Sequence, residues 1–196
     1  MPVPAATLAA LRPPFPSSPS PGPTRLRVPD LLYATDQAAD DVLSGRCDHL
    51  LPPGGIPASR RWFTRIHGDE ELDVWLISWV PGHPTELHDH GGSLGALTVV
   101  SGSLNEYRWD GRALRRRRLD AGDQAGFPLG WVHDVVWAPR PVSGPVSRRP
   151  PPPPAAPTLS VHAYSPPLTA MSYYDITERK TLRRQRTELT DQPEGS

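Results

Sequence analysis

Two histidines separated by one residue, His88 and His90, place the strongest constraint on how this chain can fold. On an extended strand, residues i and i+2 point to the same face, so both imidazoles can reach one point in space. Imidazole binds divalent iron, copper, nickel and zinc, and such a pair is a usual way to hold one of these ions. Surface pairs of histidines also occur by chance, so the interpretation depends on the residues around them.

Glycines at fixed intervals surround the pair, and a stretch with glycine and proline follows it. In chain order, the two stretches contain Gly82, His88, His90, Gly95 and Gly102, then Gly122, Pro128, Gly130 and His133. They resemble the first and second motifs of the cupin superfamily in register. Glycine and proline turn the chain at strand ends, and the strands between them aim histidines into a barrel. The chain departs from the motifs at Gly95, where most cupins have a carboxylate, and at Trp137, where the motif has Asn.

The resemblance extends to the bacterial branch of the cysteine dioxygenase family, over roughly residues 60–175. It is carried by Phe63-Thr64-Arg65 upstream of the motifs and by the nine-residue string from Ser160 to Leu168 downstream. The family implies a mainly β fold, a small cupin-type, jelly-roll-like barrel with N-terminal helices. It also implies a non-haem iron(II) enzyme that adds dioxygen to the thiol of L-cysteine and gives cysteine sulfinate.

The resemblance assigns roles to single residues of three kinds: metal ligands, substrate-binding residues and a hydrogen-bonded relay beside the substrate. The ligands are His88, His90 and His133; the substrate-binding residues are Phe63, Arg65 and Tyr164; the relay is Ser160, His162 and Tyr164. Some family members link a cysteine covalently to the tyrosine of the site. Because Gly95 stands at that cysteine's position, we expect Tyr164 to be unmodified.

The chemistry of these residue types agrees with the resemblance. Three neutral imidazoles leave the metal with its full charge, which favours an anionic thiolate ligand. Open positions on the metal can then orient the thiolate, the amine and dioxygen together. The planar fork of Arg65 suits a carboxylate. Since His162 and Tyr164 alternate along one predicted strand, both can point inward.

Other functions stay open. A dioxygenase for 3-mercaptopropionate is one alternative, although relatives of that kind carry Gln where Arg65 stands. A non-catalytic cupin that binds a metal or small ligand as a sensor is another; no pair of DNA-binding helices is visible in the sequence to support it.

Several single residues also have an alternative interpretation. His133 and the pair His162 and Tyr164 can be packed core residues, and Arg65 can belong to a structural ion pair. Glu86 shares strand parity with His88, which makes it a possible carboxylate ligand, but we expect it to be solvated. We expect His67 and His83 to lie in turns without a role in the site.

Composition excludes some partners. Lys plus Arg and Asp plus Glu both number 21 among the 196 residues, so no global charge favours nucleic acid or a membrane surface. Cys47 is the only cysteine, which excludes an internal disulfide and fits a reducing cytoplasm. No run of 18 apolar residues occurs. We therefore expect a cytoplasmic monomer whose partners are L-cysteine and dioxygen, without nucleic acid or membrane.

The 27 prolines divide the chain, because most of them lie in two blocks. We expect a disordered leader over residues 1–24 and a disordered loop over residues 138–157, since proline-rich segments cannot join a sheet ladder. Between them we place an N-terminal helical segment over 25–55, starting near Pro29, and a catalytic barrel over 56–180. Residues 181–196 are expected to form a polar tail.

The barrel should contain about eight strands. The expected strands are Arg61–Ile66, Leu72–Trp79, Ala96–Val100, Ser103–Trp109, Arg112–Leu119, Gln124–Phe127, His133–Trp137 and Thr158–Tyr164. The fifth contains four consecutive arginines, 115–118, which favour an exposed edge strand over a binding site for an anionic partner.

Overall fold

The computed structural model of the protein describes residues 24–139 and 156–194. This part contains one α-helix, one short 3-10 helix and eleven strands. The helices are α1 (Val28–Leu43) and η1 (Asp48–Leu50). The strands are β1 (Trp62–Gly68), β2 (Asp73–Trp79), β3 (His88–Asp89), β4 (Leu94–Ser101), β5 (Ser103–Trp109), β6 (Leu114–Asp120), β7 (Gln124–Phe127), β8 (His133–Trp137), β9 (Thr158–Ser165), β10 (Ala170–Ile176) and β11 (Leu182–Leu189).

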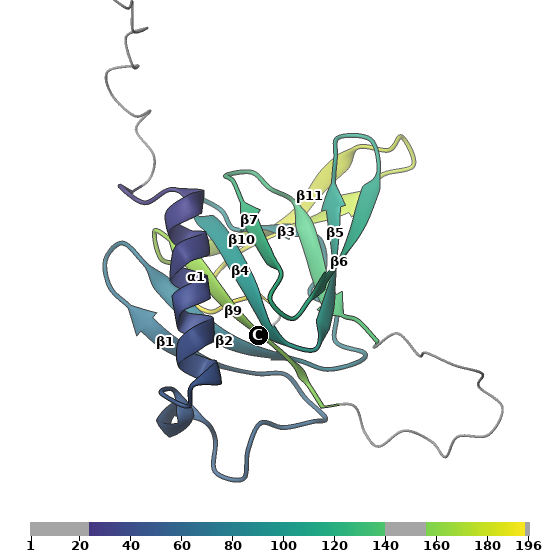
Figure 1. Ribbon diagram of the computed structural model, residues 1–196. Coiled ribbons are helices and arrows are strands. Elements are labelled where there is room, and N and C mark those ends of the chain that lie inside the picture. The colour runs from purple at the N-terminus through teal and green to yellow at the C-terminus, as the bar shows by residue number, and fades with distance from the viewer. Residues whose placement is uncertain (1–23, 140–155, 195–196) are drawn as a thin grey trace, which may run out of the picture.

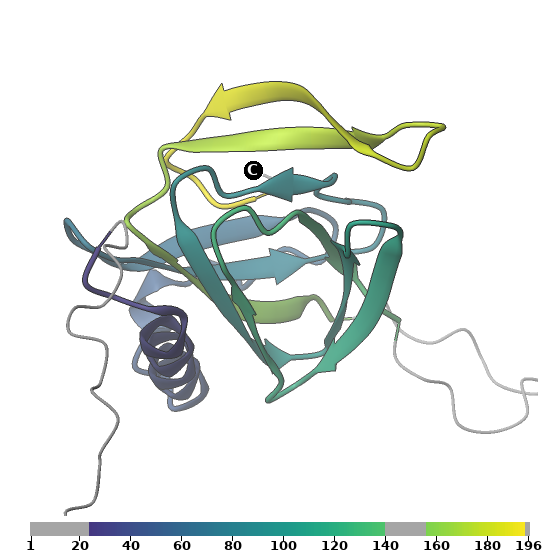
Figure 2. The ribbon, with the colours of Figure 1, turned by 90° about the horizontal axis from the view of Figure 1, so that it is seen from above.

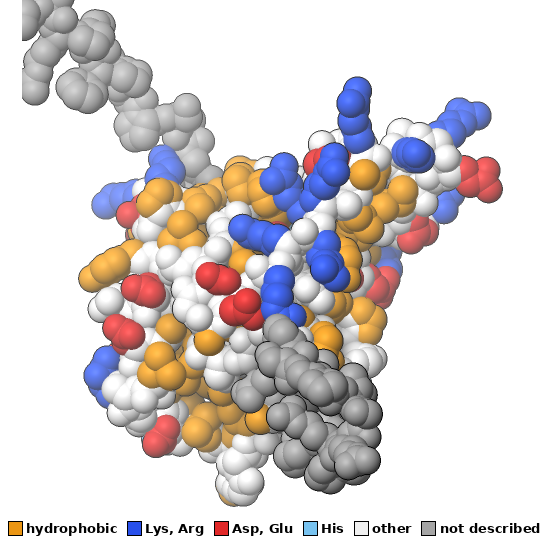
Figure 3. Space-filling view, turned by 45° about the vertical axis from the view of Figure 1, so that its right-hand side comes forward, with side chains coloured by type: hydrophobic (Ala, Val, Ile, Leu, Met, Phe, Trp, Pro, Cys, Tyr) orange, Lys and Arg blue, Asp and Glu red, His pale blue; other side chains and the backbone are white. Residues whose placement is uncertain are grey.

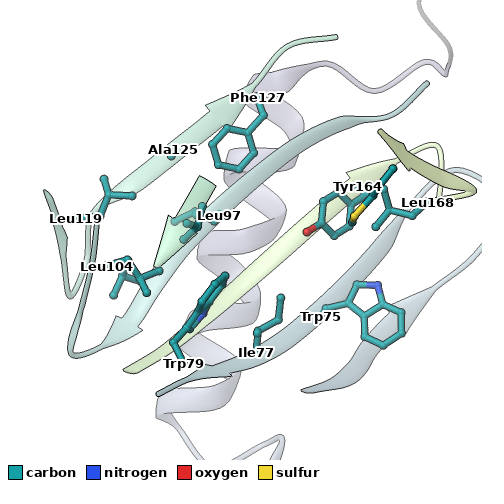
Figure 4. Close-up of a cluster of buried hydrophobic side chains, with 13 residues drawn as sticks. Trp75, Ile77, Trp79, Leu97, Leu104, Leu119, Ala125, Phe127, Tyr164 and Leu168 are labelled. Atoms are coloured by element: carbon teal, nitrogen blue, oxygen red, sulfur yellow. The ribbon is translucent and has the colours of Figure 1, made fainter. Parts of the chain in front are cut away.

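The strands form two antiparallel sheets that face each other across the core (Figures 1 and 2). One sheet has the order β1-β2-β9-β4-β7, and the other has the order β11-β10-β3-β8-β5-β6. The inner faces of both sheets supply the larger hydrophobic cluster, which includes Trp79, Leu97, Leu104 and Phe127 (Figure 4). The predicted fold class, a mainly β cupin-type barrel, is confirmed.

The central strands of the first sheet are buried on both faces. In β2, Trp75 and Ile77 belong to the inner cluster, whereas Val74 and Leu76 belong to a second cluster under α1. Helix α1 lies across the outer face of this sheet, over β4 and β9 (Figure 1). This cover explains why β2 lacks the alternation of apolar and polar residues that a strand with one solvated face would show.

The helical segment begins where the sequence predicts and ends earlier. Pro29 lies in the first turn of α1, where its missing N–H costs nothing, and the backbone N–H of Arg27 donates to Asp30 Oδ2 at 2.7 Å. Beyond Leu43 only the short η1 is helical, so one α-helix and one 3-10 turn replace the several N-terminal helices expected. Cys47 is buried and His49 is exposed.

The largest difference between the structure and the sequence-based prediction lies in the C-terminal part of the chain. Residues 182–189, expected to be polar tail, form strand β11, which pairs with β10 along its whole length. Together with the short β3, this hairpin raises the strand number from about eight to eleven in the described part of the chain. Nearly every residue of β11 is exposed, so the strand has no apolar face for a sequence pattern to reveal. The predicted leader 1–24 and loop 138–157 lie almost wholly outside the described residues.

The arginine run lies on β6, at the edge of the second sheet, and its side chains are largely exposed. Figure 3 shows basic side chains gathered on this face. Arg115 pairs with Asp110, Arg117 with Glu106, and the edge-strand interpretation is confirmed. Within residues 24–139 and 156–194, no helix is long and apolar enough to cross a membrane.

Candidate metal centre

Strands β3 and β8 bring three histidines together. His88 lies directly opposite His133 in the register of these strands, and His90 follows β3 by one residue. The three ring centroids are 4.9 to 5.2 Å apart, and all three side chains are buried. One nitrogen from each ring lies within 4.8 Å of the other two. The structure thus joins the three predicted ligands, which are 45 residues apart in the chain at most.

The hydrogen bonds of the three rings fit a metal ion. His88 Nδ1 lies 2.9 Å from the carbonyl oxygen of Glu86, and His133 Nδ1 lies 3.1 Å from Glu106 Oε1, so each Nδ1 carries a proton and donates it. The Nε2 atoms of all three histidines are buried and have no hydrogen-bond partner among the described residues. Buried polar atoms without a partner are rare and costly. Three such atoms facing one point can hold a metal, which would satisfy them together.

The site also keeps the imidazoles of His88 and His90 neutral. Burial, followed by the proximity of His133, lowers the pKa of His88 to about 4. Burial and the neighbouring His133 and His88 lower the pKa of His90 well below its ordinary value. A neutral imidazole has a free lone pair for a metal, whereas a protonated one has none. Both residues are therefore ready to act as ligands at neutral pH.

Glu106, on β5, is the partner of His133 that the sequence did not reveal. Its buried carboxylate accepts hydrogen bonds from His133 Nδ1, from Trp131 Nε1 at 3.1 Å and from Arg117 Nε. Burial alone would raise the pKa of Glu106, but His133, Trp131 and Arg117 outweigh it and lower the pKa to about 2. An ionised partner fixes the tautomer of a histidine ligand and increases its basicity. Glu106 shares its face of β5 with Leu104 and Arg108, so no apolar pattern in the sequence marked it as an inward-facing acid.

The predicted relay forms along the inner face of β9. Trp79 Nε1 donates to Ser160 Oγ at 2.7 Å, and Ser160 Oγ lies 2.9 Å from His162 Nε2. His162 Nδ1 lies 3.2 Å from the hydroxyl of Tyr164, whose ring is centred 5.1 Å from that of His90. Because the Tyr164 hydroxyl donates onward to Glu194, His162 donates from Nδ1 and accepts the Ser160 proton at Nε2. The relay thus has one consistent direction.

Gly95 lies close against the rings of His90 and Phe127. A Cβ atom at position 95 would lie 3.2 Å from His90 Nδ1 and 3.0 Å from the ring of Phe127. Gly95 also lies opposite Tyr164 in the register of β4 and β9. The glycine therefore lets the His90 ring pack against the strand, and it offers no side chain that could be linked to Tyr164.

Glu194 is the least expected member of the site, because it comes from the predicted polar tail. Only 1% of its surface is exposed. Its Oε2 accepts the hydrogen bond from Tyr164, and its Oε1 lies 2.8 Å from His162 Nδ1. Burial would raise the pKa of Glu194, but the proximity of His162 and its hydrogen bond to the carboxylate lower that pKa well below its ordinary value. Burial and this carboxylate raise the pKa of Tyr164 well above its ordinary value, so the phenol keeps its proton.

Arg61, just before β1, holds the same segment. Its Nη2 donates to the carbonyl oxygen of Glu194 at 2.6 Å, and its guanidinium lies 4.0 Å from the ring centroid of Trp79. Its Nε and Nη1 atoms are buried and have no partner in the part of the chain that the structure describes. Burial lowers the pKa of Arg61. No sequence signal distinguished this arginine from its neighbour Arg60.

Arg65 and Phe63 lie on the inner side of β1, and Phe63 packs edge-on against Trp75 at 5.9 Å. The Arg65 guanidinium lies 4.5 Å from the Trp75 ring centroid and 43% of its side chain is exposed. Its Nε lies 3.4 Å from Asp73 Oδ1, and its Nη2 donates to the carbonyl oxygen of Asp191 at 3.3 Å. Arg65 thus contacts the segment before Glu194 rather than the relay.

The remaining candidates lie on the surface. Glu86 is exposed and pairs with Arg186 at 3.1 Å, so its solvated interpretation is confirmed. His67 lies at the end of β1 instead of in a turn, where it is exposed and pairs with Asp69 at 3.0 Å. His83 is exposed and lies in the irregular segment that directly follows the turn at residues 81–82.

Several solved structures share part of the fold. They include KdgF from a Halomonas species (18% identity, 54% of this chain and 80% of that chain, TM-score 0.41). A double-stranded β-helix protein from Klebsiella pneumoniae has 21% identity over 61% of this chain and 85% of that chain, with a TM-score of 0.42. The Cnp3 cupin domain of Schizosaccharomyces pombe has 6% identity over 57% and 64%, with a TM-score of 0.43. These likenesses carry no information on activity.

The sequence itself is more specific. Residues 57–127 match the family model of cysteine dioxygenase type I. The matched part includes the first cupin-like motif with His88 and His90, and also Phe63, Arg65 and Glu106. Over these residues the predicted resemblance to the cysteine dioxygenase family is confirmed.

Proposed function

We propose that this protein is an iron-dependent dioxygenase that oxidises the thiol of L-cysteine to cysteine sulfinate. The observation that carries the proposal is the pairing of two features within one buried site. Three histidines present unpartnered Nε2 atoms, and the Tyr164 relay lies beside them. The family match adds the reaction class, a metal-dependent thiol dioxygenase.

His88, His90 and His133 would hold the iron, for which neutral imidazole is a suitable ligand. When bound there, iron would supply a site for the thiolate and the redox chemistry that joins dioxygen to sulfur. The chain contributes the neutral state of His88 and His90 and, through Glu106, the orientation of His133.

Tyr164 has the role of a proton-bearing donor in this proposal. The raised pKa keeps its hydroxyl protonated at neutral pH, so it can donate to negative charge on a substrate that takes the place of the Glu194 carboxylate. Its position is fixed from behind by His162, which is fixed in turn by Ser160 and Trp79. All of these side chains are nearly or fully buried, which excludes competing water and strengthens each hydrogen bond.

We further propose that Arg65 and Phe63 contribute to recognition of the substrate, with Arg65 taking its carboxylate. The contact from Arg65 Nε to Asp73 is 3.4 Å, longer than the 2.7 to 2.9 Å of a well-formed charged hydrogen bond. The guanidinium is half-exposed, so its other N–H groups can donate to a substrate carboxylate while Nε stays beside the buried Asp73. This recognition favours L-cysteine over cysteamine, which has no carboxylate.

A non-catalytic metal sensor is the rival function. It would need the three histidines, but it would not need a directional chain of four hydrogen-bonded side chains that ends next to them. A dioxygenase for 3-mercaptopropionate would use the same site, so substrate comparison separates it from the main proposal.

The test loads purified protein with ferrous iron under anaerobic conditions and then measures oxygen uptake and sulfinate formation with L-cysteine. We expect one iron per chain, turnover with L-cysteine and loss of both in His133→Ala, because one of three ligands is missing. Arg65→Gln should keep its iron and raise the Michaelis constant for L-cysteine about 10- to 150-fold, the value of about 1.5–3 kcal/mol for a charged hydrogen bond. Full iron occupancy in His133→Ala, or iron-loaded protein without sulfinate, would contradict the proposal.

A further inference from the structure

Residues 190–194, which we call the strap, return from the end of β11 towards the barrel (Figure 2). Three hydrogen bonds to its backbone hold it. The Thr190 N–H donates to the carbonyl oxygen of Thr169 at 3.1 Å, while Arg65 and Arg61 donate to the carbonyl oxygens of Asp191 and Glu194. The strap thus engages two arginines near the site: Arg61, just before β1, and Arg65, on the inner side of β1.

The side chain at the end of the strap is an acid placed among the residues of the site. The Glu194 carboxylate contacts the hydroxyl of Tyr164 and lies 2.8 Å from His162 Nδ1. Among residues 24–139 and 156–194, no guanidinium contacts its carboxylate oxygens, since Arg61 binds only its backbone carbonyl. A buried carboxylate without a full ion pair is costly, so it is found where the surroundings favour negative charge. The surroundings here form a subsite for an acidic group.

Arg61 provides the second, independent observation. It is a cation with two buried nitrogen donors that no described residue accepts. Buried arginines are normally paired with acids, because an unpaired buried charge costs several kilocalories per mole. Its free donors, next to Trp79 and the strap, fit an incoming anionic group better than any group the chain supplies.

We propose that Glu194 determines specificity by occupying the acidic-group subsite formed by Arg61, His162 and Tyr164. Because Arg65 is also engaged by the strap, a thiol that carries its own carboxylate reaches Arg65 and this subsite only by displacing the strap, whereas a thiol without a carboxylate does not compete with it. The inference rests on the proposed function, which makes a small thiol the ligand of the site.

The exposure of its residues indicates that the strap can be displaced. Asp191 and Gln192 are exposed, and only Pro193 and Glu194 are buried. A segment with exposed residues, outside the paired strands of the sheets, opens more readily than the strands themselves. Displacement also exchanges one carboxylate for another at Tyr164 and releases the donors of Arg61, so much of the lost interaction is recovered. Because the strap is tethered, its carboxylate competes at a high effective concentration.

The test compares wild type with Glu194→Ala and with the matched control Gln192→Ala, whose exposed side chain makes no contact with the site. Metal-loaded, anaerobic protein is titrated calorimetrically with 3-mercaptopropionate, which has a carboxylate and no amine, and with cysteamine, which has an amine and no carboxylate. Glu194→Ala should tighten binding of 3-mercaptopropionate about 10-fold or more, since a charged competitor is removed. Cysteamine affinity should change less than about twofold, and the control should resemble wild type.

Hydrogen exchange of the strap amides gives a readout that does not depend on turnover. In wild type, 3-mercaptopropionate should accelerate exchange at residues 190–194 and cysteamine should not. The isosteric Glu194→Gln variant, which keeps the shape and loses the charge, should bind 3-mercaptopropionate with intermediate affinity.

Equal weakening of both thiols by Glu194→Ala, or binding of 3-mercaptopropionate with no change in strap exchange, would overturn the inference. Turnover of L-cysteine with an immobile strap would refute the inference alone. Strap displacement without oxygen uptake would refute the proposed dioxygenase activity alone, and binding of neither thiol would refute both.

Discussion

Replacing Glu106 by Gln tests whether this acid tunes the metal centre. The Oε1 atom of Glu106 accepts from both His133 and Trp131, and an amide oxygen can keep these two contacts. The amide nitrogen then faces Arg117 Nε, which is also a donor, so that contact is lost. Arg117 is half-exposed and can turn to water, so we expect the metal-free variant to lose only about 1 kcal/mol of stability.

The affinity for the metal should fall more than the stability of the fold. Loss of the negative charge makes His133 a weaker base, and removal of such a partner typically costs 10- to 100-fold in metal affinity. Competition with a chelator under anaerobic conditions measures this affinity, and thermal unfolding of the metal-free protein measures the fold. Glu188→Gln is the control, because Glu188 has a similar ion pair with Arg186 on the surface. Affinity within about twofold of wild type in a folded Glu106→Gln protein would show that Glu106 serves packing alone.

Two further predictions concern the ends of the described segments. Replacing residues 139–156 by a short glycine-containing turn should leave metal binding and thermal stability unchanged. Ala138 and Thr158 both hydrogen-bond to Ser103, and loop closure costs only about 0.6 kcal/mol per doubling of length. Loss of metal binding or of thermal stability would show that the segment packs against the barrel. The lowered pKa of Glu194 means that its contribution to stability is complete above the ordinary value of 4.5 and is lost as the pH falls through the lowered pKa. The melting-temperature difference between wild type and Glu194→Gln should therefore stay constant from about pH 7 to 5 and shrink at lower pH, and a difference that grows on acidification would contradict the assigned direction.

The sequence predicted the parts of the site that short-range spacing determines. His88 and His90 alternate on a strand, and glycines mark the turns around them, so their convergence followed from local geometry. Ser160, His162 and Tyr164 likewise share one face of β9 because they alternate. The large strands of the barrel were found for the same reason, since each combines β-forming residues with turn signals at its ends.

The parts that were missed depend on contacts between segments far apart in the chain. Arg61 and Glu194 are separated by 133 positions, and neither belongs to a pattern with a period. Strand β11 carries mostly polar residues and pairs with a single neighbour, so it resembles an exposed tail in composition. Hydrogen bonding to β10, rather than burial, places it, and backbone pairing leaves no mark on the sequence.

Arg61, just before β1, and Arg65, within it, show how an unpredicted residue changes the role that can be assigned to a predicted one. From the sequence alone, Arg65 is predicted to bind the carboxylate of the substrate. In the structure both Arg61 and Arg65 already bind carbonyl oxygens of the strap, and the nearest acid to Tyr164 is the chain's own Glu194. Because exchanging one carboxylate for another leaves the charge beside Arg61 unchanged, binding of a carboxylated thiol depends on the difference between two similar interactions. Discrimination among thiols then depends on the free energy needed to displace the strap, as well as on the affinity of the arginines for the substrate carboxylate.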